Sequence, residues 1–255
     1  MIRSKLMKSG IEHRRRPRGL RLEFFGSSVR GPLHAKDARP CEDAWQGKQL
    51  PSAVAIAVSD GMGSKPSAAL GAKAACGAAL RAARSWSSAT AVGTDWICRL
   101  LEAQWRFAVA PEDPQNCAAT CHLLAAHKDA GLVYIGLGDG LALFQSGDEP
   151  VQCLSTRRSS EFVNETLALG VNHRLGDWIQ VRLPTTGKPW IAALVTDGVA
   201  DDLNPEKLDA FMKWLRHDIA RKPRATRSAA LRSALREWPT PGHLDDKTIA
   251  VLFSH

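Results

Sequence analysis

The sequence predicts an α+β protein in which antiparallel strands are layered against pairs of helices. Three observations indicate this class. Short apolar runs separated by polar turns fill residues 118–154, which is typical of an antiparallel meander. Two longer segments, residues 66–109 and 203–238, each have the composition and length of a helix pair. Because strands surround these helix pairs instead of alternating with them, layers are favoured over a doubly wound parallel sheet.

The elements follow from local signals. Residues 22–29 form a first strand, and residues 30–42 are irregular because Gly-Pro and Arg-Pro steps interrupt them. Residues 156–177 are polar and mixed, and we expect a flap-like insertion there. The other expected elements are strands at 54–59, 118–126, 132–137, 141–145, 151–154, 190–196 and 248–253, and helices at 66–86, 95–109, 203–219 and 226–238.

The positive charge of the chain lies in its first residues. Residues 1–21 hold eight Lys or Arg and one acid, whereas residues 22–255 hold 26 Lys or Arg and 25 Asp or Glu. We expect residues 1–21 to be a disordered, solvated tail. The alternative is an electrostatic tether to nucleic acid, anionic lipid or an acidic partner. Residues 22–255 are expected to form a single domain.

Composition also limits the location. No apolar run approaches the roughly 20 residues of a membrane span, and no signal-peptide pattern precedes the domain. The six cysteines are scattered and do not resemble a disulfide framework. We therefore expect reduced cysteines and a cytoplasmic, monomeric protein.

Three apolar runs end in Asp-Gly, and this is the main functional signal. The pairs are Asp60-Gly61, Asp139-Gly140 and Asp197-Gly198. A glycine after the carboxylate lets the backbone approach a ligand closely. Any one of these acids alone is more often a turn residue or a helix cap. Together they suggest carboxylates gathered at one place. Further candidates are Glu42, Asp43, Asp201, Asp202, Asp245 and Asp246.

Oxygen ligands without a His or Cys cluster indicate Mg²⁺ or Mn²⁺ instead of zinc. Carboxylates that converge without a cation would raise one another's pKa values. Two divalent ions about 3.5–4 Å apart would remove this repulsion, share a bridging water and clamp a phosphoryl group.

The order of the acidic motifs resembles that of the metal-dependent type-2C Ser/Thr protein phosphatases. The matching segments are Glu42-Asp43-Ala44, residues 59–64 (SDGMGS), residues 138–140 (GDG), residues 195–201 (VTDGVAD) and residues 245–251 (DDKTIAV). The resemblance covers roughly residues 22–253. It implies an antiparallel β-sandwich flanked on both faces by pairs of antiparallel helices, a four-layer α-β-β-α arrangement.

The resemblance also implies a set of metal ligands for two Mg²⁺ or Mn²⁺ ions, with a third held more weakly. Asp60 resembles the carboxylate that bridges both ions, and Gly61 would offer its backbone carbonyl. Asp43 would reach the second ion directly or through water, with Glu42 as its neighbour. Asp197 and Asp245 resemble the remaining ligands of the first ion, with Asp245 ranked above Asp246, and Asp139 resembles a ligand of the third. The nucleophile would be a water bound by the two ions.

The chain departs from the family pattern where the substrate phosphate is gripped. The family usually has Arg at the position of Ala38. A bacterial subgroup has His in this role, so His34 is the first candidate and Arg39 the second. With Met62 after Asp60-Gly61, protonation of the leaving group would fall to His34 or to water. Gly140 replaces the family's serine, which could loosen the third ion.

The resemblance implies hydrolysis of phosphoserine and phosphothreonine in a protein substrate, in opposition to a bacterial Ser/Thr kinase. Two alternatives stay open. One is a catalytically weak or inactive phosphoprotein-binding module on the same fold. The other is a dimetal hydrolase for small phosphoesters or nucleotides.

Overall fold

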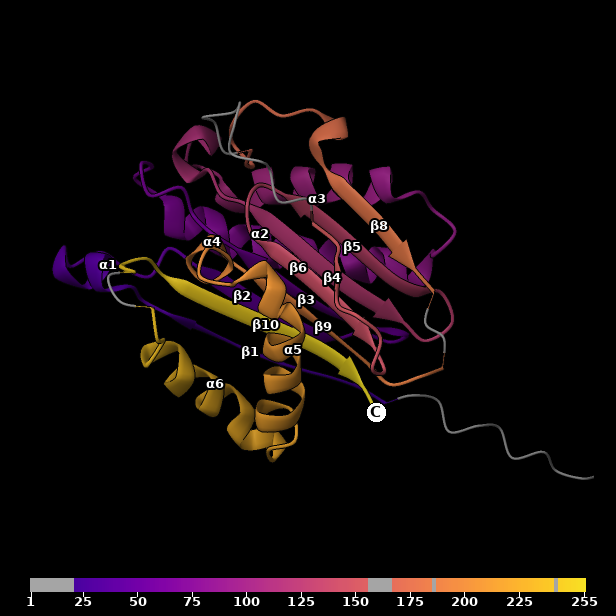
Figure 1. Ribbon diagram of the computed structural model, residues 1–255. Coiled ribbons are helices and arrows are strands. Elements are labelled where there is room, and N and C mark those ends of the chain that lie inside the picture. Colours follow the sequence, from indigo (N-terminus) through magenta and orange to yellow (C-terminus); the bar gives the residue numbers. More distant parts are fainter. Residues whose placement is uncertain (1–20, 156–166, 185–186, 241–242) are drawn as a thin grey trace, which may run out of the picture.

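The computed structural model describes residues 21–155, 167–184, 187–240 and 243–255. Two five-stranded antiparallel sheets pack face to face, with helices covering the outer face of each (Figure 1). This is the four-layer sandwich that the sequence predicts. The expected disorder of residues 1–20 lies outside the described residues.

The first sheet has the strand order β1-β10-β9-β6-β7, and the second has the order β2-β3-β4-β5-β8. Helices α2 and α3 cover the second sheet, and α5 and α6 cover the first. The strands are β1 (Leu22–Val29), β2 (Ala44–Gln49), β3 (Ala53–Ser59), β4 (Cys121–His127), β5 (Gly131–Leu137), β6 (Leu141–Ser146), β7 (Gln152–Cys153), β8 (Ile179–Leu183), β9 (Trp190–Val195) and β10 (Lys247–Ser254). The helices are α1 (Pro32–Lys36), α2 (Ala68–Ser88), α3 (Thr94–Val109), α4 (Asp197–Ala200), α5 (Leu208–Trp214) and α6 (Arg227–Arg236).

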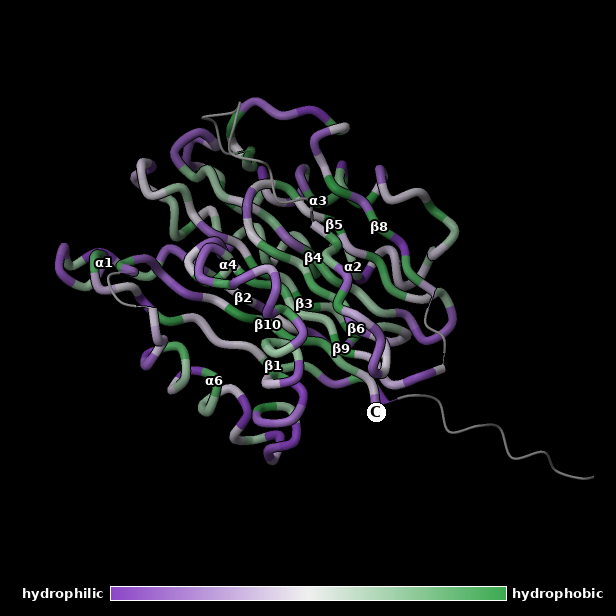
Figure 2. Tube along the Cα trace, viewed as in Figure 1, coloured by the Kyte–Doolittle hydropathy of each residue, from purple (hydrophilic) through white to green (hydrophobic). Residues whose placement is uncertain are grey.

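Strand β3 shows why the central strands read as continuous apolar runs. All seven of its residues are buried, because both faces of the sheet are covered. Ile56 and its neighbours at alternate positions face the opposite sheet. Ala55 and Ala57 face α2 and α3, where their small side chains leave room for an Ala-rich helix. Figure 2 shows the hydrophobic residues concentrated in these middle layers.

The predicted irregular segment before Glu42 contains a short helix, α1. Gly31 stands at its N-cap and Pro32 in its first turn, a placement that proline favours. Ala38 follows in the left-handed region, with φ of 56°. This turn lets the N–H of Arg39 donate to the carbonyl of His34 at 2.8 Å, which closes the helix and directs Arg39 back across it.

The predicted single helix at 203–219 is wrong in detail. A 3₁₀ turn comes first, because the side chain of Asn204 accepts from the N–H of Glu206 and Pro205 stands in the first turn. Helix α5 then begins at Leu208, and a π-helical turn, Leu215–Ile219, ends the segment. The edge strand β2 carries too little apolar periodicity to be recognised in the sequence. The edge strand β8 was missed although its residues alternate between apolar and polar.

The predicted insertion at 156–177 lies partly outside the described residues. Its described part is fixed to the sheet at Leu169, whose N–H and C=O pair with those of Ala119 at 2.9 and 3.1 Å. No helix within the described ranges is long and apolar enough to cross a bilayer. All six cysteines are free thiols.

Candidate functional site

The acidic residues gather at one end of the sandwich. Strand β2 begins where β3 ends, and β10 begins where β9 ends, because both pairs are antiparallel. In the described part of the chain no three His, Cys, Asp or Glu side chains are close enough together to hold an ion as they stand. The acids at these strand ends are Asp43 before β2, Asp60 after β3, Asp197 after β9 and Asp245 before β10.

Backbone contacts fix the turn that carries Asp60. Its N–H donates to Oγ1 of Thr120 at 2.9 Å, and its carbonyl accepts from the N–H of Thr120 at 2.8 Å. Gly61 lies against the start of α2, where a Cβ atom would stand 2.6 Å from the carbonyl oxygen of Ala68. Glycine is therefore required by this close approach as well as by any ligand.

Asp43 is buried and only half satisfied. Its Oδ2 accepts from the hydroxyl of Thr196 at 2.7 Å, and that hydroxyl accepts from the N–H of Thr248 at 3.1 Å. Oδ1 is buried and has no hydrogen-bond partner. An unpartnered buried carboxylate oxygen is costly, so this atom is a candidate ligand for a cation.

The acids disfavour one another's charged forms. Burial raises the pKa of Asp43 to about 7, with Asp197 and Asp246 adding to the shift against the two threonine hydroxyls. Burial and then repulsion by Asp245 and Asp139 raise the pKa of Asp197 to about 7 as well. Burial, followed by Asp43 and Asp197, raises the pKa of Asp60 well above that of an ordinary aspartate. Carboxylates from distant parts of the chain therefore share one electrostatic environment.

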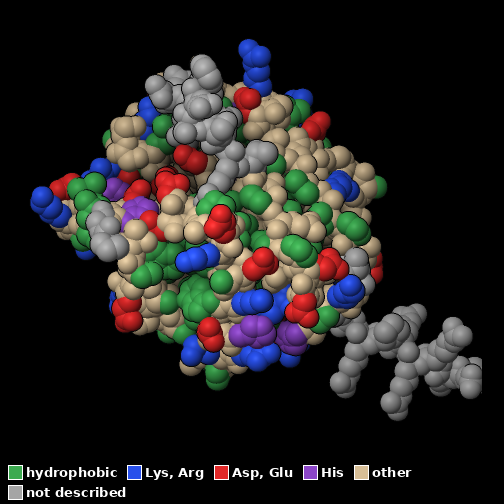
Figure 3. Space-filling model, in the orientation of Figure 1, with side chains coloured by type: hydrophobic (Ala, Val, Ile, Leu, Met, Phe, Trp, Pro, Cys, Tyr) green, Lys and Arg blue, Asp and Glu red, His purple; other side chains and the backbone are tan. Residues whose placement is uncertain are grey.

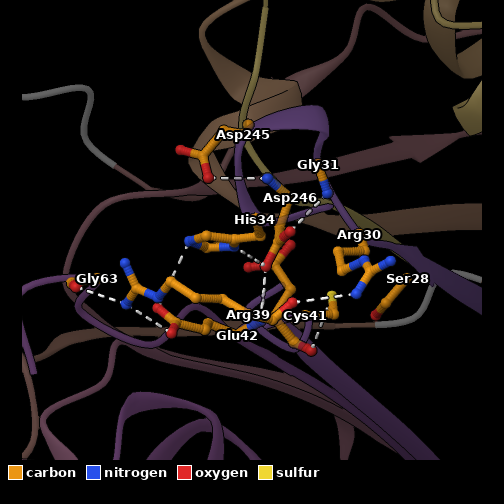
Figure 4. A network of polar contacts seen from close by, with 12 residues as sticks. Ser28, Arg30, Gly31, His34, Arg39, Cys41, Glu42, Gly63, Asp245 and Asp246 are labelled. Atoms are coloured by element: carbon orange, nitrogen blue, oxygen red, sulfur yellow. Dashed lines mark hydrogen bonds and ion pairs between the residues drawn. The ribbon is translucent and has the colours of Figure 1, made fainter. Parts of the chain in front are cut away.

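Asp246 lies beside this group but makes a different set of contacts (Figure 4). One oxygen accepts from the N–H of Gly31 at 2.6 Å. The other accepts from the N–H of Glu42 at 2.6 Å and lies 3.0 Å from Nδ1 of His34. Its side chain is 1% exposed. Asp246 thus ties the loop before β2 to the start of β10. Asp245 is exposed, and its charge adds to the effect of burial in raising the pKa of Asp197.

Glu42 belongs to this second group of contacts. Its Oε1 accepts from the guanidinium of Arg39 at 2.7 Å, and its buried Oε2 lies 3.8 Å from Nε2 of His34 without a hydrogen bond. Arg39 also donates to the carbonyl of Gly63 at 2.7 Å. Arg39 and Lys65 line a cavity of about 450 Å³ next to Glu42.

A family model for protein phosphatase 2C matches residues 30–238. The chain belongs to the protein phosphatase 2C family. The match covers all of the acidic motifs except the last, at Asp245, which the geometry adds to the group. A comparison of the sequence with curated proteins gives no match.

Solved structures of phosphatase 2C type share the fold at low sequence identity. A serine/threonine phosphatase of S. agalactiae is 12% identical with a TM-score of 0.60, over 91% of this chain and 99% of its own. RsbX, crystallised in complex with magnesium, is 14% identical with a TM-score of 0.56, over 92% and 100%. The phosphatase domain of SiaA from Pseudomonas aeruginosa is 21% identical with a TM-score of 0.55, over 90% and 85%.

The residues present fit the divalent cations that are general in the phosphatase 2C family. The donors are carboxylate oxygens, which Mg²⁺ and Mn²⁺ prefer. Asp43 and Glu42 each keep a buried oxygen without a partner. Burial and then neighbouring aspartates raise the pKa values of Asp60 and Asp197, and a divalent cation held among them would favour their charged forms.

The structure also contains a buried polar pair that the sequence did not reveal. His122 of β4 is 1% exposed; its Nε2 lies 2.7 Å from the carbonyl of Asp139 and its Nδ1 lies 2.9 Å from the hydroxyl of Tyr134. Burial lowers the pKa of His122. Gly140 is required here, because a Cβ would stand 2.8 Å from Nε2 of His122. The sequence signal that could have indicated this pair is a histidine, His122, within a mostly apolar strand.

Proposed function

We propose that this chain is a metal-dependent protein phosphatase that hydrolyses phosphoserine and phosphothreonine. The observation that supports it best is the convergence of Asp43, Asp60 and Asp197 at one end of the sandwich, where burial and then neighbouring aspartates raise the pKa of each. Phosphoryl transfer depends mainly on positioning and on neutralising negative charge. A carboxylate group of this kind supplies both once cations occupy it.

The aspartates would hold Mg²⁺ or Mn²⁺, two ions with a weaker third. Asp60 and the Gly61 carbonyl are the central ligands, with Asp43, Asp197 and Asp245 around them and Asp139 toward the third ion. Bound there, divalent cations would neutralise a phosphoryl group and lower the pKa of a water molecule. The Oδ2 of Asp43 is held by the hydroxyl of Thr196, so its unpartnered Oδ1 is the oxygen that would bind a cation.

Arg39 is the residue that we propose for binding the substrate phosphate. Glu42 and the Gly63 carbonyl hold one terminal nitrogen of its guanidinium, which leaves other donors for a phosphate. Lys65 lines the same cavity and would add a second positive charge. His34 is 9% exposed and held by Asp246, so it is better suited to donate a proton to the leaving group than to grip the phosphate.

A substrate panel tests this proposal against a small-phosphoester hydrolase. Phosphothreonine and phosphoserine peptides, free nucleotides and sugar phosphates would be compared with Mn²⁺ present. We expect kcat/KM to be highest for the phosphopeptides. Higher kcat/KM for nucleotides or sugar phosphates would overturn the assignment of a protein substrate. With phosphopeptides as substrates, the physiological partner would be a protein phosphorylated by a Ser/Thr kinase.

One observation favours a second candidate, a phosphoprotein-binding module without turnover. Ala38 stands where the family usually has its phosphate-binding arginine. In that case, a phosphopeptide would bind in the presence of Mn²⁺ and would be released unchanged. Isothermal titration followed by mass spectrometry of the recovered peptide separates the two functions.

A further inference from the structure

A second cavity, of about 300 Å³, lies at the opposite end of the sandwich. Trp190 at the start of β9 and Phe253 near the end of β10 contribute to its walls. The acidic group lies at the other ends of these same two strands. Since a strand rises about 3.3 Å per residue, the two sites are roughly 20 Å apart. The second cavity is therefore separate from the candidate metal centre.

The walls of this cavity are cationic. Arg216, Arg221, Arg227 and His255 line it, and no acidic side chain of the described residues does. Figure 3 shows Lys, Arg and His side chains gathered on this part of the surface. Glu23 lies behind them, and its carboxylate is shared by Arg227, by Arg21 at 3.2 Å and by His255 at 3.8 Å. Even with the carboxylate that ends this chain counted, positive charge exceeds negative charge here.

Arg216 is fixed in place without being neutralised. It donates to the carbonyls of Gly147 at 2.8 Å and Gln145 at 3.3 Å, and makes no ion pair with a described carboxylate. Burial lowers its pKa, against a smaller opposite effect of Asp148. Arg221 is exposed, and no described residue pairs with it. The cavity thus offers one guanidinium that is held in place, that of Arg216, and one that is free to approach a carboxylate or phosphate, that of Arg221.

The first described residue, Arg21, lies beside the same cavity. The backbones of Arg21 and His255 exchange two hydrogen bonds, of 3.0 and 3.1 Å. Residues 1–20 contain seven Lys or Arg and one Glu. The arginines that line the cavity carry three positive charges among described residues, so its partner should carry several negative charges.

We propose that this basic pocket binds an acidic segment of a protein partner, rich in Asp and Glu. The aromatic rings that line the pocket are too buried to bind a single-stranded nucleic acid by stacking, which favours a protein partner. Trp190 and Phe253 are 2% and 8% exposed, so they offer no open face on which bases could stack. The large hydrophobic residues that are exposed in the described ranges are elsewhere, at Leu33, Leu70, Trp96, Phe107 and Leu244, so no described side chain beside the pocket is suited to insert into a lipid surface.

Fluorescence anisotropy of a labelled peptide of alternating Glu, Asp and Leu tests this site, with the full chain and EDTA present. Binding in EDTA keeps the test separate from catalysis. We expect Arg221→Glu to weaken binding about tenfold, or about 1.4 kcal/mol. Arg216→Gln, which can still donate to the two carbonyls, should weaken it as well. Raising the ionic strength from about 0.01 to about 0.15 M should also weaken it.

Arg236→Glu is the matched control, because Arg236 is an exposed residue at the far end of α6 and the substitution changes net charge equally. It should alter the dissociation constant less than about twofold. An equal loss of affinity in Arg236→Glu and Arg221→Glu would overturn the proposal that the peptide binds in this pocket. Absence of binding by the wild-type chain at low salt would overturn it too. Tighter, Arg221-dependent binding of a DNA oligomer of the same charge would replace the protein partner by nucleic acid.

Discussion

The carboxylate of Asp246 accepts a hydrogen bond of 2.6 Å from the backbone N–H of Glu42, across 204 residues of sequence. Through this bond and the one from Gly31, the loop that carries Arg39, Glu42 and Asp43 is held against the start of β10. Adjacent aspartates in the sequence therefore have opposite tasks. Asp246 holds the loop, and we propose that Asp245 holds a cation.

Substitution of the two aspartates should separate these tasks. Asp246→Asn replaces one acceptor oxygen by an NH₂ group, which would face backbone N–H groups that need an acceptor. We therefore expect the free energy of unfolding to fall by about 1–3 kcal/mol. Asp245→Asn removes a charge that raises the pKa of Asp197, so we expect little loss of stability but weaker Mn²⁺ binding. Urea unfolding in EDTA and calorimetric titration with Mn²⁺ measure the two effects. Weaker Mn²⁺ binding in Asp246→Asn, together with a loss of stability in Asp245→Asn, would show that Asp246 is the ligand.

The stability of the metal-free protein should decrease as pH rises toward neutrality. Burial raises the pKa values of Asp43 and Asp197 to about 7, so the folded state binds more protons than the unfolded state between the ordinary aspartate value and pH 7. The stabilisation by these protons is complete below about pH 4 and is lost as pH passes through 7. Thermal unfolding in EDTA across pH 5.5–8 tests this, and added Mn²⁺ should stabilise most at the upper end.

The matching controls are Asp43→Asn and Asp197→Asn, which should flatten the pH dependence. They are needed because His122, whose pKa burial lowers, titrates in the opposite sense: its contribution is present above the ordinary histidine value and is lost as pH falls. An unchanged pH profile in both variants would contradict the raised pKa values of Asp43 and Asp197.

The positive φ of Ala38 predicts a stabilising substitution. An alanine in the left-handed region costs roughly 1 kcal/mol relative to glycine. We therefore expect Ala38→Gly to raise the free energy of unfolding by about 0.5–1 kcal/mol, as measured in urea. Ala35→Gly in α1, where φ is helical, is the control and should destabilise. A destabilised Ala38→Gly protein would show that the strain of Ala38 in the folded state is smaller than the conformational entropy that glycine adds to the unfolded state.

Loss of Arg39 should act mainly on the substrate, with a smaller loss of stability because Glu42 loses its ion-pair partner. Its hydrogen bonds to a charged phosphate would contribute about 1.5–3 kcal/mol, so Arg39→Ala should lower kcat/KM for a phosphopeptide about 10–100-fold. Lys36→Ala, at an exposed residue that ends the nearby helix α1, should change it little. A larger loss in His34→Ala through KM, with Arg39→Ala near wild type, would return the phosphate-binding role to His34.

Much of the fold could be predicted because the central strands are buried on both faces. Continuous apolar runs such as Ala53–Ser59 are unambiguous, and the predicted first strand coincides with Leu22–Val29. The edge strand Ala44–Gln49 was missed, because a half-exposed edge needs no apolar pattern. The start of α5 was misplaced, although Asn204-Pro205 carried the cap signal.

The candidate site divides in the same way. Asp60 and Asp197 were visible because each follows an apolar strand and precedes a glycine. The separate tasks of Asp245 and Asp246 were not, because the contacts of Asp246 come from residues more than 200 positions away. His122 is similar: its contact with the Asp139 carbonyl depends on the pairing of β4 with β5, which no local pattern specifies.

The most direct test of the account is the release of phosphate from a phosphothreonine peptide as Mn²⁺ is titrated. We expect hydrolysis to rise with Mn²⁺, to vanish in EDTA and to fall by several orders of magnitude in Asp60→Asn, whose fold should survive. Hydrolysis that persists in EDTA, or a fully active Asp60→Asn protein, would contradict a phosphatase centre built on these aspartates.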